Sequence, residues 1–135
     1  ALSEPALAEE AARAGDDHAI PHVKAAFVMA PAIVQGFDPG SLREDQIPVA
    51  IILGDMDAVA PPDTNGRVAA KLLPHAELKE LGGVGHYDFL ATCTPAGVAT
   101  IPFCVHRVPQ QPTHEAAISD ALAFFARTLG APPQP

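Results

Sequence analysis

The sequence predicts an α/β fold built on a parallel sheet, and three apolar segments carry that prediction. Residues 49–53 form an unbroken apolar run, rich in β-branched side chains and ended by Gly54, which is typical of a strand buried on both faces. Residues 23–29 form a second apolar run, which stops before Pro31 and predicts another such strand. Residues 76–81 alternate apolar and polar side chains, which predicts a strand nearer the edge of the sheet.

A helix is predicted between the second and third strands along the chain. Residues 63–73 carry an apolar stripe at helical spacing, with Asp63 or Thr64 as the cap and Pro74 as the stop. A strand, a helix and a strand joined by short connections imply a right-handed crossover and therefore parallel pairing. Residues 3–14 are rich in Ala and Glu, and they predict a weakly buried helix ahead of the sheet, capped by Ser3.

The last third of the chain divides into a loop and a helix. Residues 92–112 carry several prolines and both cysteines, so we expect an ordered loop there. Residues 113–129 are the clearest helix of the chain, with Thr113 as its cap. Its predicted buried stripe has members at i, i+4, i+7 and i+11, namely Ile118, Leu122, Phe125 and Leu129.

Composition indicates a globular, acidic chain with one core. The chain has 135 residues, of which 48% are hydrophobic and 18% charged. A formal net charge of -8 with scattered basic residues argues against nucleic acid as a partner, and no apolar stretch approaches the length of a membrane span. Three strands are too few for a sheet covered on both faces, and both sheet edges would be bare. We therefore expect residues 1–135 to be the C-terminal portion of a larger single domain.

Two side chains suited to acid–base chemistry follow neighbouring strands. Asp57 comes after the central strand, and His86 comes after the next strand, directly behind a glycine-rich turn. Because the carboxyl ends of parallel strands share one edge of a sheet, we expect the two side chains to meet. A carboxylate held against an imidazole fixes its tautomer, so that the histidine acts as a general base. The structural alternatives are a turn carboxylate and a loop histidine packed under Tyr87 and Phe89.

This arrangement resembles the C-terminal half of an α/β-hydrolase. That family places its triad acid in a G-x-x-D-x-x-x-P context, here Gly54 to Pro61, and its triad histidine behind a glycine, here Gly85 before His86. The resemblance is strongest to the dienelactone-hydrolase branch, related to plasma platelet-activating-factor acetylhydrolase, through the segments VKAAFVMAPA, GDMDAVAPP and GHYDFL. It implies a three-layer α/β-hydrolase fold with Asp57 and His86 as catalytic residues, without any metal or organic cofactor.

The chain departs from that family in two ways. The platelet-activating-factor enzymes place their acid after the earlier strand, where this chain reads MAPA, so Asp57 is the better candidate and Asp55 is a turn residue. The family nucleophile is a serine in G-x-S-x-G, and no such motif occurs here. The resemblance implies that the serine lies on an upstream or separate segment of the same hydrolase, which would be a partner of this chain. The serines of this chain are predicted in a cap, a loop and a helix: Ser3, Ser41 and Ser119.

Cys93 and Cys104 stand 11 residues apart in the proline-rich loop, and three interpretations are open. A disulfide is the first, and it implies an oxidising compartment such as the periplasm or the exterior. Two reduced, buried thiols in a cytoplasmic protein are the second. The third is a metal site completed by His106 and His114, although that spacing matches no common zinc pattern. The remaining histidines are predicted at loop and surface positions: His18, His22 and His75.

The sequence thus favours an enzyme over a binding module. The first hypothesis is a serine hydrolase that cleaves small carboxylic esters or lactones, with its serine outside this chain. The alternative is a non-catalytic, hydrolase-like interaction module whose bare sheet edge pairs with a partner. Near His86, the side chains of Tyr87 and Phe89 are expected to pack rather than to contact substrate, and Asp88 is expected to start a helix.

Overall fold

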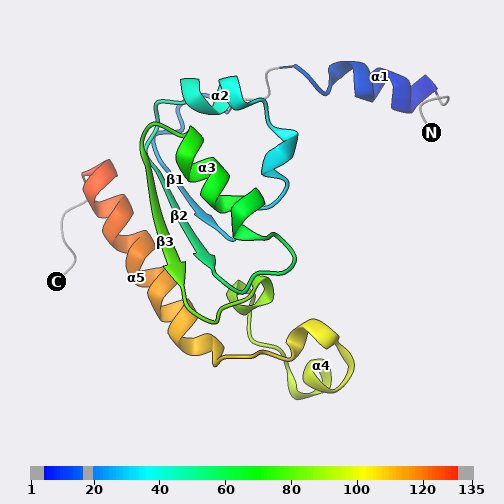
Figure 1. Cartoon of the computed structure of the whole chain (residues 1–135), viewed down its shortest axis with the longest axis vertical. Coiled ribbons are helices and arrows are strands. Elements are labelled where there is room, and N and C mark those ends of the chain that lie inside the picture. Colours follow the sequence, from blue (N-terminus) through cyan, green and yellow to red (C-terminus); the bar gives the residue numbers. More distant parts are fainter. Residues whose placement is uncertain (1–4, 17–19, 131–135) are drawn as a thin grey trace.

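The computed structural model describes residues 5–16 and 20–130 and is organised around a three-stranded sheet (Figure 1). Strand β2, Val49–Gly54, lies in the middle, with β1, Ala26–Met29, on one side and β3, Ala76–Leu81, on the other. Both pairs are parallel, so the predicted sheet is confirmed. Three parts of the sequence predictions lie outside the described residues: the cap Ser3, His18 and residues 131–135.

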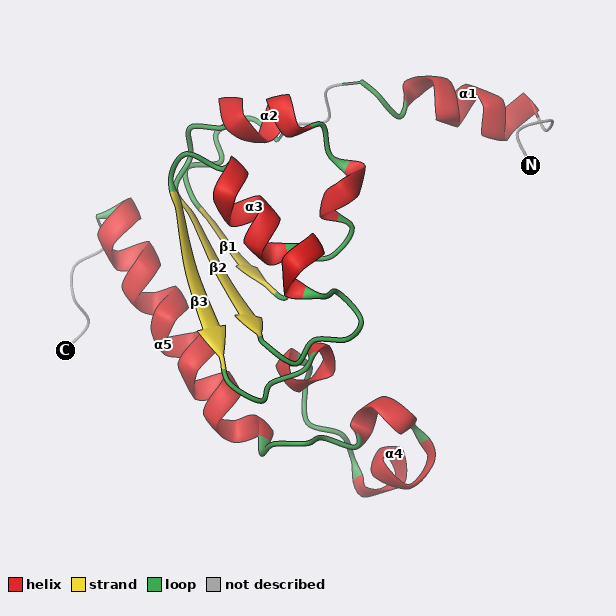
Figure 2. Cartoon of the chain, viewed as in Figure 1, coloured by secondary structure: helices red, strands yellow, loops and turns green. Residues whose placement is uncertain are grey.

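Helices cover both faces of the sheet (Figure 2). On one face lie α3, Gly66–Leu72, and the short α2, Pro39–Glu44; α5, Gln110–Leu129, runs along the other face. Helix α4, Pro95–Thr100, lies beyond the arrowheads of the strands, and α1, Pro5–Arg13, is exposed. The order helix, sheet, helix confirms the predicted three-layer α/β arrangement. Among the described residues, no helix has the length and hydropathy needed to cross a membrane.

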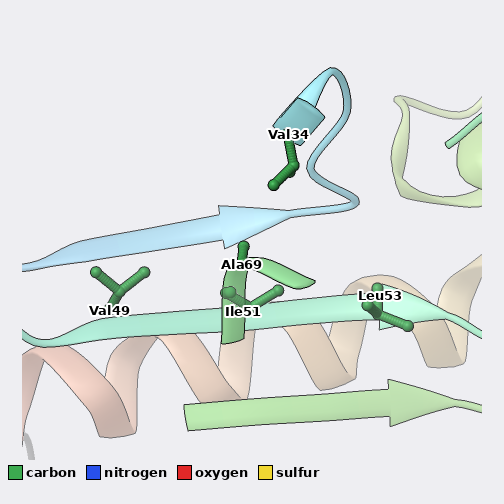
Figure 3. Packing of buried hydrophobic residues seen from close by; sticks show 5 residues of the cluster. All are labelled: Val34, Val49, Ile51, Leu53 and Ala69. Carbon is green, nitrogen blue, oxygen red and sulfur yellow. The ribbon is translucent and has the colours of Figure 1, made fainter. Parts of the chain in front are cut away.

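The face of β2 toward α3 holds the main hydrophobic cluster (Figure 3). Val49, Ile51 and Leu53 alternate along the strand, and they pack with Val34 from the loop after β1 and with Ala69 of α3. All five side chains are buried. Burial of one such aliphatic side chain stabilises the fold by about 1.5–3 kcal/mol, so this cluster anchors α3 to the sheet.

The opposite face of β2 packs against α5. Ile52 and Phe124 are each 1% exposed, the lowest values among the buried residues. The Phe27 ring of β1 lies 6.3 Å from the Phe124 ring and 6.4 Å from the Phe125 ring, which are separations typical of aromatic pairs. Because β2 is covered on both faces, its sequence is apolar at every position rather than at alternate ones.

The start of α3 differs from the prediction. A 3-10 turn, Pro62–Thr64, precedes the helix, and Asn65 occupies the cap position instead of Asp63 or Thr64. The Asn65 side chain accepts a hydrogen bond from the Val34 N–H at 3.2 Å and donates one to the Pro61 carbonyl at 3.1 Å. The side chain thus joins α3 to the loop after β1, a long-range role that local capping rules cannot reveal.

Two predictions for α5 are wrong. The helix begins at Gln110, and Thr113 is buried within its first turns instead of capping it. Most of the predicted stripe is exposed, with Ile118 at 60% and Leu122 at 66%, although Phe125 is partly buried against Phe27. A different line of side chains, which includes the fully buried Phe124, faces the sheet, and Asp120 and Arg127 form surface ion pairs with β3 beside it. The buried line consists of Gln110, Thr113, Ala117 and Phe124.

Two further segments depart from the predictions. Strand β1 is shorter than residues 23–29 and only partly buried, since Met29 is half exposed and no described strand pairs with its outer edge. Residues 92–112 are more regular than a loop, because α4 is followed by a 3-10 turn, Pro102–Cys104. The Thr94 hydroxyl caps α4 by accepting from the Gly97 N–H at 3.2 Å.

Candidate functional site

Asp57 lies just beyond the carboxyl end of β2, where the chain turns away from the sheet. Its Oδ1 accepts hydrogen bonds from the backbone N–H groups of Val59 at 2.9 Å and Ala60 at 2.7 Å. Asp57 is 5% exposed, so its carboxylate is taken out of water and held by its own turn. This bonding leaves Oδ2 directed at a group from outside the turn.

That group is His86, which opens the 3-10 turn His86–Phe89 after β3. The His86 Nδ1 lies 2.8 Å from Asp57 Oδ2. A carboxylate in this position accepts, so Nδ1 carries the proton and Nε2 is left with a free lone pair. The edge of the His86 ring is packed against Tyr87, with ring centroids 5.4 Å apart. The structure therefore brings together the two side chains that the sequence singled out.

A close backbone approach sets the distance between the two turns. Gly54, the last residue of β2, lies so near the Val84 carbonyl that a Cβ built on it would stand 2.0 Å from that oxygen. Across the same gap, Asp55 Oδ1 accepts from the Gly83 N–H at 2.7 Å. Asp55 is exposed and does not contact His86 in the described hydrogen bonds, so it acts as a turn residue, as predicted.

A cavity of about 480 Å³ opens beside His86. Its walls come from the turn after β2, the turn after β3 and the segment that follows α4. The Tyr87 and Phe103 rings form one wall, with centroids 5.0 Å apart, so Tyr87 contributes to the cavity as well as to packing. The apolar side chains of the lining are Met56, Ala58, Val59, Tyr87, Pro102, Phe103 and Val105.

The sequence did not reveal a second carboxylate–imidazole contact behind His86. Asp88 Oδ1 lies 2.6 Å from His106 Nδ1, and Asp88 Oδ2 accepts from the Gly85 N–H at 2.6 Å. Asp88 was expected only to start a helix, and His106 only as a metal ligand. Gln110 adds to this support by donating from Nε2 to the Leu90 carbonyl at 3.0 Å. The sole hint in the sequence was the position of Asp88, two residues after His86.

Cys93 and Cys104 form a disulfide, which confirms the first of the three interpretations. The metal interpretation is wrong for these residues, because both sulfurs are used and the two histidines bind elsewhere: His106 pairs with Asp88, and His114 with the Leu90 carbonyl at 2.9 Å. Among the described residues, no cluster of three or more His, Cys, Asp or Glu side chains could hold a metal ion.

Among the described residues that line the cavity, none is a serine or a free cysteine. Ser41 lies at the start of α2, where its hydroxyl donates to the Asp38 carbonyl at 2.8 Å. Ser119 lies on an exposed face of α5. Neither serine lines the cavity beside His86. Among the described residues, the site therefore holds the Asp57 carboxylate and the His86 imidazole without a serine or free cysteine beside them.

Comparison with known proteins gives one significant curated match. No protein family profile matches the chain. Over 61 residues the chain is 36% identical to the non-heme chloroperoxidase CPO-A1 of Kitasatospora aureofaciens, a match that covers 45% of this chain and 18% of that protein. The chloroperoxidase has the α/β-hydrolase fold, so this match agrees with the superfamily resemblance seen in the sequence. The match does not identify the dienelactone-hydrolase branch, so that finer resemblance stays a prediction.

Two solved structures are also similar. One is a bromoperoxidase from Bacillus anthracis, at 22% identity and a TM-score of 0.41 over 66% of this chain and 24% of that chain. The other, BpoC from Mycobacterium tuberculosis H37Rv, is described as a non-heme bromoperoxidase, at 26% identity and a TM-score of 0.45 over 70% and 27% of the two chains. The chain thus spans about a quarter of the length of these proteins.

Proposed function

We propose that this chain is the acid- and base-bearing part of a serine hydrolase that cleaves carboxylic esters or lactones. The observation that carries the proposal is the 2.8 Å contact between His86 Nδ1 and Asp57 Oδ2 at the carboxyl ends of adjacent parallel strands. Support also comes from the cavity beside His86, because its apolar walls suit the uncharged carbon skeleton of an ester or lactone.

In this proposal the nucleophilic serine belongs to an upstream or separate segment of the same hydrolase. His86 Nε2 takes the serine proton as the hydroxyl attacks the substrate carbonyl, and it returns that proton to the leaving oxygen. Asp57 holds the ring in the Nδ1–H tautomer and stabilises the imidazolium that forms. Neither step requires a metal or an organic cofactor. A water molecule, activated by His86 in the same way, then releases the acyl group.

The test uses the intact protein that contains this chain, with p-nitrophenyl esters and a serine-directed phosphonylating reagent. We expect Asp57→Asn and His86→Ala to lower kcat/KM by about 10³-fold or more. Asp55→Asn is the matched control, and it should cost less than about tenfold because Asp55 only braces a turn. The reagent should label a serine outside residues 1–135. A damaging Asp55→Asn together with a mild Asp57→Asn would reverse the assignment.

A second candidate follows from the name of the curated relative. Because that relative is described as a chloroperoxidase, peroxide-dependent chlorination is the alternative activity of the same site. Chlorination of a diketone reporter by the intact protein, with hydrogen peroxide and chloride, measures it directly. Turnover there that exceeds ester hydrolysis, and that is lost in His86→Ala, would favour the second candidate over the first.

The non-catalytic alternative rests on the open edge of β1, which could pair with a partner strand. A mass spectrum of the native sample distinguishes the interaction module from the hydrolase. A second polypeptide, or a longer chain, with a G-x-S-x-G serine favours the hydrolase, and a lone 14.0 kDa species favours the interaction module. The disulfide favours an oxidising compartment, periplasmic or secreted, for either function.

A further inference from the structure

The candidate for a further role is the buried pair formed by Asp88 and His106. The side chains of Asp88 and His106 are 6% and 16% exposed, and their nearest atoms are 2.6 Å apart. A carboxylate removed from water to this extent is stable only where hydrogen bonds replace its lost hydration. Asp88 has two such bonds, one from His106 and one from the Gly85 N–H. The proposed chemistry of Asp57 and His86 uses neither member of the pair.

The location of the pair links it to His86. Gly85 directly precedes His86, so the Asp88 carboxylate holds the Val84–Gly85 peptide, one residue ahead of the Cα that carries the imidazole. His86 has one hydrogen bond from its ring among the described contacts, the bond to Asp57, and its side chain is 24% exposed. The direction of the imidazole therefore depends on the backbone behind it, which Asp88 fixes.

His106 supplies the other end of the brace. It follows the disulfide-bonded Cys104 by two residues, and the disulfide ties its segment to Cys93, four residues beyond the turn that begins at His86. Its Nδ1 donates to Asp88, since an ionised carboxylate can only accept. Its Nε2 is buried without a described hydrogen-bond partner, which marks the Nδ1 bond as the one polar contact that holds this ring.

We propose that Asp88 and His106 are positioning residues that keep the His86 imidazole aimed at Asp57. The pair clamps the turn 85–89 against the disulfide-bonded segment, and loss of the clamp lets the His86 ring leave the geometry in which Asp57 selects its tautomer. This inference rests on the proposed role of His86 as a base. Asp88 and His106 also contribute to the lining of the cavity beside His86, but the role proposed for them is to hold the turn.

The test compares paired substitutions in the intact protein with nitrogen-15 labelled histidine rings. Long-range proton–nitrogen correlations report which ring nitrogen of His86 carries the proton, through carbon-bound protons that do not exchange. In the unaltered protein the Nδ1–H tautomer should dominate. His106→Leu should lower the ratio of the two tautomers by about fivefold, because Asp88 then loses its partner. His106→Gln, which still offers an N–H donor, should retain the ratio within about twofold.

One control, a kinetic measurement and a second variant complete the experiment. His114→Leu removes an imidazole that holds the same turn at Leu90 without touching Asp88, and it should leave the His86 tautomer unchanged. On a p-nitrophenyl ester, His106→Leu should lower kcat by about tenfold to a hundredfold with KM nearly constant, since a misaimed base slows the chemical step. Asp88→Asn should act in the same direction as His106→Leu.

The outcomes separate this inference from the proposed function. Asp57→Asn should change the His86 tautomer in any case, and if it does not, the proposed base–acid pair fails. If Asp57→Asn acts as expected while His106→Leu matches His106→Gln, the pair merely fills space and the positioning role is overturned. If a His106 variant does not fold, Asp88→Asn provides the same comparison, and an unchanged tautomer in that variant also overturns the role.

Discussion

The two edges of the sheet differ in chemistry. On β3 the charged side chains are all paired: Glu77 with Arg127, Lys79 with Asp120, and Glu80 with Arg67. On β1 the sequence is AFVM, without a charge, and no described strand pairs with its outer edge. The apolar stripe of α5 lies on this same side, because one of its members, Phe125, packs against Phe27 of β1. Charged edges resist further strand pairing and apolar ones invite it.

This difference bears on two expectations. The sequence predicted two bare edges, and among the described strands neither β1 nor β3 has a partner on its outer side. The charged side chains of β3 make its edge the less prone of the two to pair with another chain. The β1 edge and the exposed Ile118 and Leu122 have the composition of surfaces that natural proteins cover. The Asp57–His86 contact lies at the ends of β2 and β3, on the side of the sheet away from the open β1 edge.

The largest expected effect is that of Gly54→Ala, at the end of β2 beside the turn that follows β3. A Cβ at this position would meet the Val84 carbonyl oxygen at 2.0 Å, and this neighbour is backbone, which cannot move aside as a flexible side chain could. We expect the free energy of unfolding to fall by about 3 kcal/mol or more, measured with a chemical denaturant. Gly82→Ala, in the turn that follows the neighbouring strand β3, is the matched control, since its Cβ meets nothing within 4 Å. Equal effects of the two substitutions would show that the close approach is not essential.

The next effect concerns the disulfide, which ties down the segment behind the site. Closing the loop from Cys93 to Cys104 should stabilise the fold by about 3 kcal/mol through loop-closure entropy. The cost of reduction should be smaller than this, because α4 and the prolines already order the loop. Unfolding curves with and without reductant measure the cost. Thiol titration of the denatured, unreduced protein is the control, and two free thiols would rule the bridge out.

At the open β1 edge and the exposed stripe of α5, the expected effect is on solubility. We expect residues 1–135 expressed alone to be poorly soluble and inactive, because the β1 edge and the α5 stripe are open. Ile118→Lys with Leu122→Lys should raise the soluble fraction, and should change stability by less than about 0.5 kcal/mol while the stripe faces water. Ser119→Lys adds the same charge at an exposed polar position of α5 and should help little. If the isolated chain is soluble, folds in two states and is active, then the β1 edge and the α5 stripe need a covering segment no more than the β3 edge does.

In the intact protein the same double substitution gives the opposite expectation. If an upstream segment covers the stripe, two buried lysines there should destabilise the protein strongly. Comparing the isolated chain with the intact protein by thermal unfolding therefore shows whether α5 is covered.

The smallest effect is at the β3 edge and depends on pH. The Arg67 guanidinium holds the pKa of Glu80 below its usual range, mainly through the hydrogen bond between them. A carboxyl whose pKa is lowered by folding stabilises the folded state above its unfolded pKa, and that contribution is lost as the pH falls through its folded pKa. Glu80→Gln should therefore be slightly less stable than the unaltered chain at pH 7. The difference should vanish in acid and shrink in high salt, as denaturant titrations can show.

The sequence revealed most where local pattern and tertiary structure agree. The apolar run at β2 and the glycines around Asp57 and His86 predicted the strand, the turns and the meeting of the two side chains, because parallel strands bring their ends to one edge. The sequence did not predict features that are set by residues distant along the chain. The rotation of α5 depends on the sheet against which Phe124 packs, and the roles of Asn65 and Asp88 depend on residues far along the chain, so no local rule could predict them.

The parallel sheet also affects how this chain acquires its structure during synthesis. No two strands form a hairpin, so each strand waits for its neighbour until an intervening helical segment has been made. Pairings of this kind form slowly compared with local ones. As the chain leaves the ribosome, β2 has β1 as its first partner, and it gains β3 only after α3 has emerged. Asp57 is thus made well before His86, and the two side chains can meet only after β3 and the turn behind it have emerged.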